Sequence, residues 1–218
     1  MSLFVPSLGP VSAARILRIQ GYADLGRVRP AIRAVADWAA EAIAPLAQPQ
    51  IGFKRLSFVR RDDEHIELSD GSQCAGVALV HELSGCDEVV IFVQTLGDGP
   101  DRKVIELSEG GDSLLEALLL ECAGWLALEE SIRQFKQVLR AEAQRRGRHL
   151  GKRLGPGYSY QLPGGQVMWP LQEQRSLFAV FKPGELPVRL MDSCAMQPKM
   201  SRSGLFGEGP GPEPRIST

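Results

Sequence analysis

The chain has 218 residues, and its 25 basic and 26 acidic side chains give a formal net charge of −1 at pH 7. A nearly neutral chain has no global field that would draw it to nucleic acid or to an anionic membrane, so we expect neither as a partner. The length allows a sizeable core in one large domain or in two small ones, and we expect one.

The first half of the chain alternates between helical and extended patterns. Ser12 can cap the first helix, and Pro45 and Pro49 are expected to close the second. The two strands that follow flank a charged turn, which predicts a hairpin. The predicted elements are helices over 12–20, 27–44 and 73–83, and strands over 53–59, 66–68 and 88–95.

A long helix over 113–146 opens the second half, with apolar residues at helical spacing and a basic final turn. High Gly and Pro content predicts loops over 147–170, followed by a short helix over 171–181 and a strand over 188–191. The Gly- and Pro-rich end cannot bury apolar area. We therefore expect a folded domain over 1–207 and a disordered tail over 208–218.

These elements interleave without a regular alternation of parallel strands and helices. The pattern favours a single α+β domain with a mainly antiparallel sheet and flanking helices. The four cysteines are scattered and lack neighbouring histidines, so neither a zinc site nor a disulfide framework is expected. No secretory leader and no apolar run of about 20 residues is evident, which suggests a soluble protein of the reducing cytoplasm.

The most informative segment is Arg153-Leu-Gly-Pro-Gly-Tyr158. Pro156 fixes one backbone dihedral and Gly157 permits many, so the pair places Tyr158 on a shaped loop with Arg153 at its mouth. A guanidinium can hold a carboxylate through two parallel hydrogen bonds. The loop can therefore clamp a small ligand, although Arg153 can also be a solvated member of the basic run 145–153.

Two further blocks follow in order, Trp169-Pro-Leu-Gln-Glu-Gln174 and Asp192-Ser-Cys-Ala-Met-Gln-Pro-Lys-Met-Ser-Arg-Ser-Gly204. Together with the Arg153 loop they resemble the reactivation (activation) domain of cobalamin-dependent methionine synthase and its free-standing relatives. The resemblance covers roughly residues 10–207. It implies the same α+β fold and binding of S-adenosylmethionine by the Arg-x-x-x-Gly-Tyr loop.

The resemblance also implies a set of ligand contacts. Glu121, a carboxylate in an apolar helical run, would meet the amino group of the ligand, unless it is a helix-edge glutamate. Tyr158 offers an aromatic face to a sulfonium, with help from Tyr160, unless both tyrosines only cover the loop. The implied site comprises Glu121, Arg153, Gly157, Tyr158, Tyr160, Ser193, Ala195, Ser201, Ser203 and Gly204.

Several positions depart from the family pattern. Residues 159–168 form an insertion, Met191 replaces the usual Thr, and Arg202 replaces a small apolar residue, so the pocket can be reshaped or its ligand changed. For the family's N-terminal acidic contact, Asp24 and Asp37 are the candidates.

His65 lies in a run similar to the Asp-x-His-x-x-Gly signature of cobalamin-binding proteins. Leu68 replaces the essential glycine, so His65 is expected to be a surface residue and the chain is not expected to hold cobalamin itself.

The resemblance implies reductive reactivation of a corrinoid by methyl transfer from S-adenosylmethionine. From the length we expect action in trans, with cobalamin supplied by a partner chain. The partner would be a corrinoid-binding protein or a methionine synthase core, with a flavodoxin-like or iron-sulfur electron donor. Two alternatives stay open. One is a non-catalytic binding or scaffold protein with this fold, and the other is a methyltransferase for a different acceptor.

Overall fold

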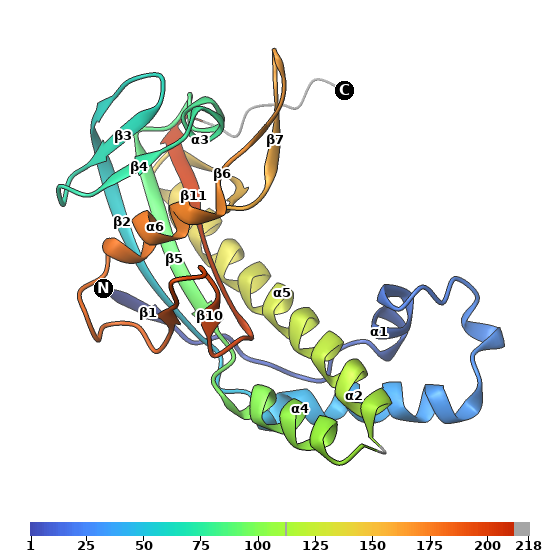
Figure 1. The fold of residues 1–218 in the computed structure, drawn as a ribbon. Coiled ribbons are helices and arrows are strands. Elements are labelled where there is room, and N and C mark those ends of the chain that lie inside the picture. Colours follow the sequence, from blue (N-terminus) through green and yellow to red (C-terminus); the bar gives the residue numbers. More distant parts are fainter. Residues whose placement is uncertain (112, 212–218) are drawn as a thin grey trace.

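The computed structural model describes residues 1–111 and 113–211. Figure 1 shows a twisted sheet on one side, a group of helices on the other, and one long helix that runs from the first to the second. The helices are α1 (Ala13–Ile19), α2 (Pro30–Leu46), α3 (Val77–Glu82), α4 (Gly99–Glu109), α5 (Leu114–Arg145) and α6 (Gln174–Ala179), with 3-10 turns η1 (Leu25–Arg27) and η2 (Leu171–Glu173).

The main sheet has seven strands in the order β4-β3-β2-β5-β11-β6, with β1 paired to β2, and every strand pair in it is antiparallel. A single α+β domain with a mainly antiparallel sheet is therefore confirmed. The strands of this sheet are β1 (Ser2–Phe4), β2 (Gln50–Arg61), β3 (His65–Leu68), β4 (Gln73–Ala75), β5 (Glu88–Thr95), β6 (Arg148–Leu154) and β11 (Ser201–Pro210). Two small hairpins pair β7 (Ser159–Leu162) with β8 (Gly165–Met168) and β9 (Arg189–Leu190) with β10 (Met196–Gln197).

Helix α5 joins two hydrophobic cores. Its 32 residues extend for about 48 Å at 1.5 Å per residue. The first half, including Leu120 and Ala127, packs with α1, α2 and α4. The second half, including Phe135, packs on one face of the sheet. Figure 1 shows the helix leaving the sheet toward α1, α2 and α4. Glu129 and Glu130 lie at the point where the helix passes from one core to the other.

The opposite face of the sheet is covered by α3, α6 and the β7–β8 hairpin. Trp169, Leu177 and Leu205 are fully buried in this core. Because alternate residues of a strand face opposite sides, β11 sends Leu205 into this core and Phe206 toward α5.

Several predicted elements are confirmed. Strand β5 spans the predicted 88–95, and the hairpin of β2 and β3 forms at the predicted turn. Ser12 caps α1 by accepting a hydrogen bond from the backbone N–H of Arg15 at 3.3 Å. The long helix α5 lies within one residue of its predicted bounds, because its caps and apolar spacing agree.

Other predictions are wrong. Residues 147–170 hold three strands rather than only loops, because β6 finds a partner in β11, which lies far away in the sequence. The segment 73–83 begins as strand β4 before α3 starts, and α4 was not predicted at all. Pro45 does not close α2, which ends at Leu46.

The predicted start of the disordered tail is also wrong. Strand β11 continues through Pro210, and Glu208 is fully buried within it. The glycines there serve close packing, since a Cβ on Gly209 would lie 2.1 Å from the carbonyl oxygen of Gly85. Residues 212–218 of the predicted tail lie outside the described part of the chain.

Candidate functional site

Arg153 lies near the end of edge strand β6, opposite Phe206 of β11, so its side chain is on the α5 face of the sheet. Both terminal nitrogens of its guanidinium donate to the carboxylate of Glu129 on α5, with N···O distances of 3.2 to 3.3 Å. The pair lies where α5 leaves the sheet, and it links strand and helix at the boundary between the two cores.

Glu129 is shared by two arginines. Arg202 of β11 also donates to its carboxylate, to the Oε1 atom that Arg153 contacts as well. Burial alone would raise the pKa of Glu129, but the hydrogen bonds from Arg202 and Arg153 outweigh it and hold the pKa below the ordinary value of 4.5. The carboxylate is thus ionised at neutral pH, and the three side chains together carry one excess positive charge.

A groove of about 520 Å³ opens beside Arg153. Its floor is apolar, from Ile132 and Phe206, and its rim is charged. Together the walls come from α1, α5, β6 and β11, so the groove exists only when helix and sheet are assembled. Its lining residues are Arg15, Glu129, Glu130, Ile132, Arg133, Lys136, Arg153 and Phe206. We call this the Arg153 groove.

The arrangement suits the zwitterion of an amino acid. A guanidinium can hold the α-carboxylate in a fork, and an adjacent carboxylate can hold the α-ammonium group. Arg153 and Glu129 offer these two groups side by side. In this structure the guanidinium and the carboxylate form an ion pair with each other.

The loop after Arg153 is held by its own backbone and by the β7–β8 hairpin. Gly157 adopts a φ of 86°, which favours glycine, and its N–H donates to the carbonyl of Trp169 at 2.7 Å. The N–H of Trp169 donates to the carbonyl of Tyr158 at 2.9 Å. Tyr158 itself is 55% exposed, so its ring can meet a ligand without unfolding the loop.

Tyr160 has a structural role. Its hydroxyl accepts from the N–H of Gly155 at 2.8 Å and donates to the carbonyl of the same residue at 3.0 Å. Burial raises the pKa of Tyr160. With the ring buried and the hydroxyl satisfied on both sides, Tyr160 shapes the loop from below rather than presenting a group to solvent.

Trp169, the first residue of the second family-like block, does not lie at the rim of an open surface. Its side chain is fully buried, and its indole N–H donates to the carbonyl of Ala75 at 2.9 Å. A Cβ on Gly76, whose φ is 135°, would lie 2.9 Å from the indole ring. Trp169 therefore anchors the Arg153 loop to the core.

The structure does not bring Glu121 to Arg153. Glu121 lies eight residues before Glu129 on α5, and its carboxylate pairs with the ammonium of Lys199 at 2.6 Å. It lines a different cavity of about 570 Å³, between α4 and the segment 191–200. The expected glutamate beside Arg153 is Glu129, which sequence reasoning missed. The sequence feature that could have identified Glu129 is its position between the two apolar stretches of α5.

Gly124 allows a close approach to α5. A Cβ there would lie 2.2 Å from the sulfur of Met200. The approaching group is therefore a side chain of the protein.

The Ser-rich block belongs mostly to strand β11. Ser201 shares a hydrogen bond of 2.9 Å with the hydroxyl of Thr95, and the buried hydroxyl of Ser203 has no partner among the described residues. A Cβ on Gly204 would lie 2.6 Å from the carbonyl oxygen of Leu154, so Gly204 admits the neighbouring strand. These three residues pack the sheet, and the described lining of the Arg153 groove does not include them.

Ser193 and Ala195 are exposed in the turn between β9 and β10, where the Ser193 hydroxyl accepts from the Ala195 N–H at 3.3 Å. Asp24 caps η1 by accepting from Gly26 at 2.9 Å, and Asp37 lies exposed on α2. His65 is half-exposed, with Nδ1 3.4 Å from Asp62. None of these residues is among the described walls of the Arg153 groove.

The predicted insertion 159–168 forms the β7–β8 hairpin. Of the other departures, Met191 lines the cavity that holds Glu121. Arg202 joins the Glu129 pair, so this departure bears directly on the charge of the site.

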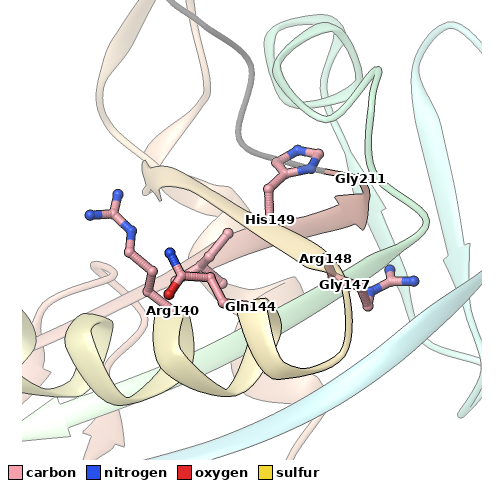
Figure 2. Close-up of a pocket in the computed structure, with 7 residues that line it drawn as sticks. Arg140, Gln144, Gly147, Arg148, His149 and Gly211 are labelled. Atoms are coloured by element: carbon pink, nitrogen blue, oxygen red, sulfur yellow. The ribbon is translucent and has the colours of Figure 1, made fainter.

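A further cavity of about 370 Å³ lies at the other end of α5 (Figure 2). Figure 2 shows the Arg148 side chain pointing away from Arg140, and Arg148 pairs with Asp87. His149 packs over Gly209, where a Cβ would lie 2.7 Å from its ring. The cavity is bordered by Gly211, and on α5 its lining begins at Arg140, one turn after Lys136 of the Arg153 groove.

Comparison with known proteins shows which solved structure has a fold similar to that of this chain. No protein-family model matches the sequence, and no curated protein matches it. Among solved structures, the chain is similar to the crystal structure of the MetH reactivation domain bound to AdoHcy, with a TM-score of 0.62 and 13% identity. The match covers 98% of this chain and 80% of that domain. Among the described helices, none is both long and apolar enough to span a membrane.

Proposed function

We propose that this protein binds S-adenosylmethionine in the Arg153 groove and presents it as the methyl donor for the reductive reactivation of a corrinoid carried by a partner chain. One observation carries the proposal. Arg153 and Glu129 meet at the lip of a groove, in a fold similar to that of a domain solved with AdoHcy.

The roles of the residues follow from their charges. Arg153 would hold the α-carboxylate of the ligand, and Glu129 would hold its α-ammonium group. Arg202 would keep Glu129 ionised and in place while Arg153 turns to the ligand. The adenosyl part would lie along the apolar floor of Ile132 and Phe206, with the exposed ring of Tyr158 nearby on the loop.

The chain's contribution would be orientation and electrostatics. A groove open to solvent lets a broad, flat corrin on another protein approach the methyl group. The corrinoid is then the methyl acceptor, and S-adenosylmethionine traps its reduced form. The partner would be a corrinoid-binding protein or a methionine synthase core, with a flavodoxin-like or iron-sulfur protein as the electron donor.

Two measurements test the proposal. Calorimetry of the purified chain with S-adenosylmethionine should show one site, which Arg153→Ala abolishes or weakens. A mixture with a Co(II) corrinoid protein and a reductant should then convert the Co(II) spectrum to that of methylcobalt. The absence of S-adenosylmethionine binding would overturn the proposal. Binding without conversion by any corrinoid protein tested would favour the alternatives.

A second candidate is a binding or scaffold protein that has this fold but no methyl-donor chemistry. The shared carboxylate favours this second candidate, since Glu129 is already bound by both Arg153 and Arg202. A ligand would have to displace one of these contacts. In this case, a pull-down with a corrinoid protein would succeed without S-adenosylmethionine and would not depend on Arg153.

A further inference from the structure

The cavity that holds Glu121 has mostly apolar walls. Val104 and Ile105 of α4 line it, and three of the protein's five methionines line it as well. These are Met191, Met196 and Met200. Methionine is unbranched and polarisable, so it adapts to apolar groups of different shapes and is common at surfaces that bind peptides. We call this cavity the methionine groove.

The apolar surface continues beyond the groove. On α5, Leu114 and Leu118 lie seven and three residues before Glu121, so all three share one face of the helix. The exposed fractions of Leu114, Leu118, Ile105 and Met191 are 45 to 61%. Because α4 packs against α5, the exposed apolar side chains extend from the groove over two adjoining helices (Figure 1). An open apolar surface of this kind is typical of a site for another polypeptide, whereas a small molecule is usually enclosed.

The same surface is strongly acidic. Residues 98–121 contain seven acidic and two basic residues, a net charge of −5, although the whole chain carries only −1. Two carboxylates of the groove are paired within it, Asp98 with Arg102 at 3.4 Å and Glu121 with Lys199 at 2.6 Å.

Asp101 is the third carboxylate of the groove. Among the described residues, its hydrogen bonds come from the backbone N–H groups of Lys199 and Met200 and not from a cationic side chain. Burial raises the pKa of Asp101, and the nearby charge of Glu121 adds to this effect. A cationic group supplied by a partner would therefore be stabilised beside Asp101.

We infer that the methionine groove and the exposed face of α4 and α5 form a docking surface for a basic amphipathic helix of a protein partner. Apolar residues of that helix, at the spacing i, i+4 and i+7, would enter the groove, and its lysines or arginines would lie along residues 98–121. An acidic helix would be repelled by the same charges. The inference goes beyond the proposed function and does not depend on it, since the described linings of the methionine groove and the Arg153 groove share no residue.

The test uses the full chain and two synthetic helical peptides of about 14 residues. One peptide has leucines at the spacing i, i+3, i+4 and i+7 and lysines elsewhere, and the other has glutamates in place of the lysines. At about 20 mM ionic strength, fluorescence anisotropy should give a Kd below about 1 mM for the lysine peptide, at least about tenfold tighter than for the glutamate peptide. At about 500 mM salt, the preference should shrink, because charges are then screened beyond a few ångströms.

A pair of double variants tests the apolar contribution. Ile105→Ser with Met191→Ser removes two exposed apolar side chains from the surface and should weaken binding of the lysine peptide about tenfold. Val59→Ser with Val138→Ser is the matched control, since these exposed side chains belong to β2 and to the second half of α5. Its affinity for the peptide should stay unchanged.

A pair of single variants tests the charge. Asp101→Asn keeps a hydrogen-bond acceptor for the backbone N–H groups but removes the charge, and it should weaken binding roughly three- to fivefold at low salt. Asp63→Asn removes a charge from the exposed turn between β2 and β3 and should have no effect. If the serine pair at 105 and 191 fails to fold, the asparagine variants decide.

Several outcomes would overturn the inference. These are a Kd for the lysine peptide weaker than about 1 mM, a smaller preference over the glutamate peptide, and equal losses in the groove variants and their controls. Titration with S-adenosylmethionine separates this inference from the proposed function. The variant with Ile105→Ser and Met191→Ser should bind that ligand as the wild type does, and a wild type that binds the lysine peptide but not S-adenosylmethionine would overturn the proposed function alone.

Discussion

At the scale of single residues, Arg153 is the position on which the proposal depends most. Its side chain is about one third exposed and lies between a strand end and the middle of α5. Such a partly exposed ion pair contributes little to folding, since the median for surface pairs is about 0 to 1 kcal/mol. The same guanidinium can contribute more to binding, where it would meet a charged ligand group.

Replacing Arg153 by Ala is expected to weaken S-adenosylmethionine binding by about 1.5 to 3 kcal/mol, the usual contribution of a hydrogen bond to a charged group. The melting temperature should change little, because Glu129 keeps its contact with Arg202. Calorimetric titration and thermal unfolding check both. Lys152→Ala is the matched control, since this neighbour on β6 pairs with Glu82 instead. An unfolded Arg153 variant, or one with unchanged affinity, would remove Arg153 from the site.

Glu129→Gln should change how stability depends on pH. The folded-state pKa of Glu129 lies below its ordinary value of 4.5, so its contribution is present above that unfolded pKa and is lost as the pH falls through the folded pKa. The wild type should be the more stable protein at pH 7, and the difference should shrink below about pH 4. Denaturant unfolding from pH 3 to pH 7 measures this, and a difference that is constant with pH would contradict it.

At the scale of elements, strand β11 has a larger structural role than its Gly- and Ser-rich composition suggests. It is paired on both sides, with β5 and β6, and it carries Arg202 to the site and Glu208 to the far end of the sheet. Its residues Gly204 and Gly209 let the backbone at Leu154 and at Gly85 approach closely. Residues 208–210, which the sequence predicts as part of the tail, therefore belong to a strand with a neighbour on each side.

Gly209→Ala tests this role. The added Cβ would lie 2.1 Å from the carbonyl oxygen of Gly85 and 2.7 Å from the ring of His149, so backbone must shift. We expect a loss of about 1 to 3 kcal/mol in the free energy of unfolding, the usual cost of overpacking. Gly9→Ala is the control, since no atom lies within 4 Å of its Cβ. Equal stability of the two variants would indicate that 208–210 are not part of the sheet.

At the scale of the whole molecule, a buried ion network joins elements that are distant in sequence. The carboxylate of Glu208 is fully buried and contacts Arg55 of β2, Arg146 at the end of α5, and Arg148 of β6. One carboxylate thus ties the sheet to the helix that also forms the second core. A charge without its partner in such a place is strongly unfavourable.

Glu208→Ala should destabilise the protein by about 3 to 5 kcal/mol, since it leaves the arginines around it without their shared carboxylate. Because α5 belongs to both cores, we expect one cooperative unfolding transition in the wild type and in the variant. Far-ultraviolet circular dichroism and Trp fluorescence should report coincident midpoints. A loss below about 1 kcal/mol would show that the network is not important for folding.

The sequence alone determined the local features, because caps, turn residues and apolar periodicity act over a few positions. Strand 88–95, the hairpin at 60–64, the long helix and the shaped loop after Arg153 were all predictable in this way. The α+β class follows from their order. The departure of Arg202 from the family pattern had also singled out a residue that pairs with Glu129 in the structure.

Only the tertiary structure decided which side chains meet. It paired Arg153 with Glu129 rather than Glu121, because the choice between glutamates eight residues apart depends on where α5 crosses the end of β6. It also buried Trp169 and drew residues 208–210 into the sheet. These outcomes depend on contacts between segments more than 20 residues apart, and no local pattern encodes such contacts, since they form only when the sheet and both cores assemble.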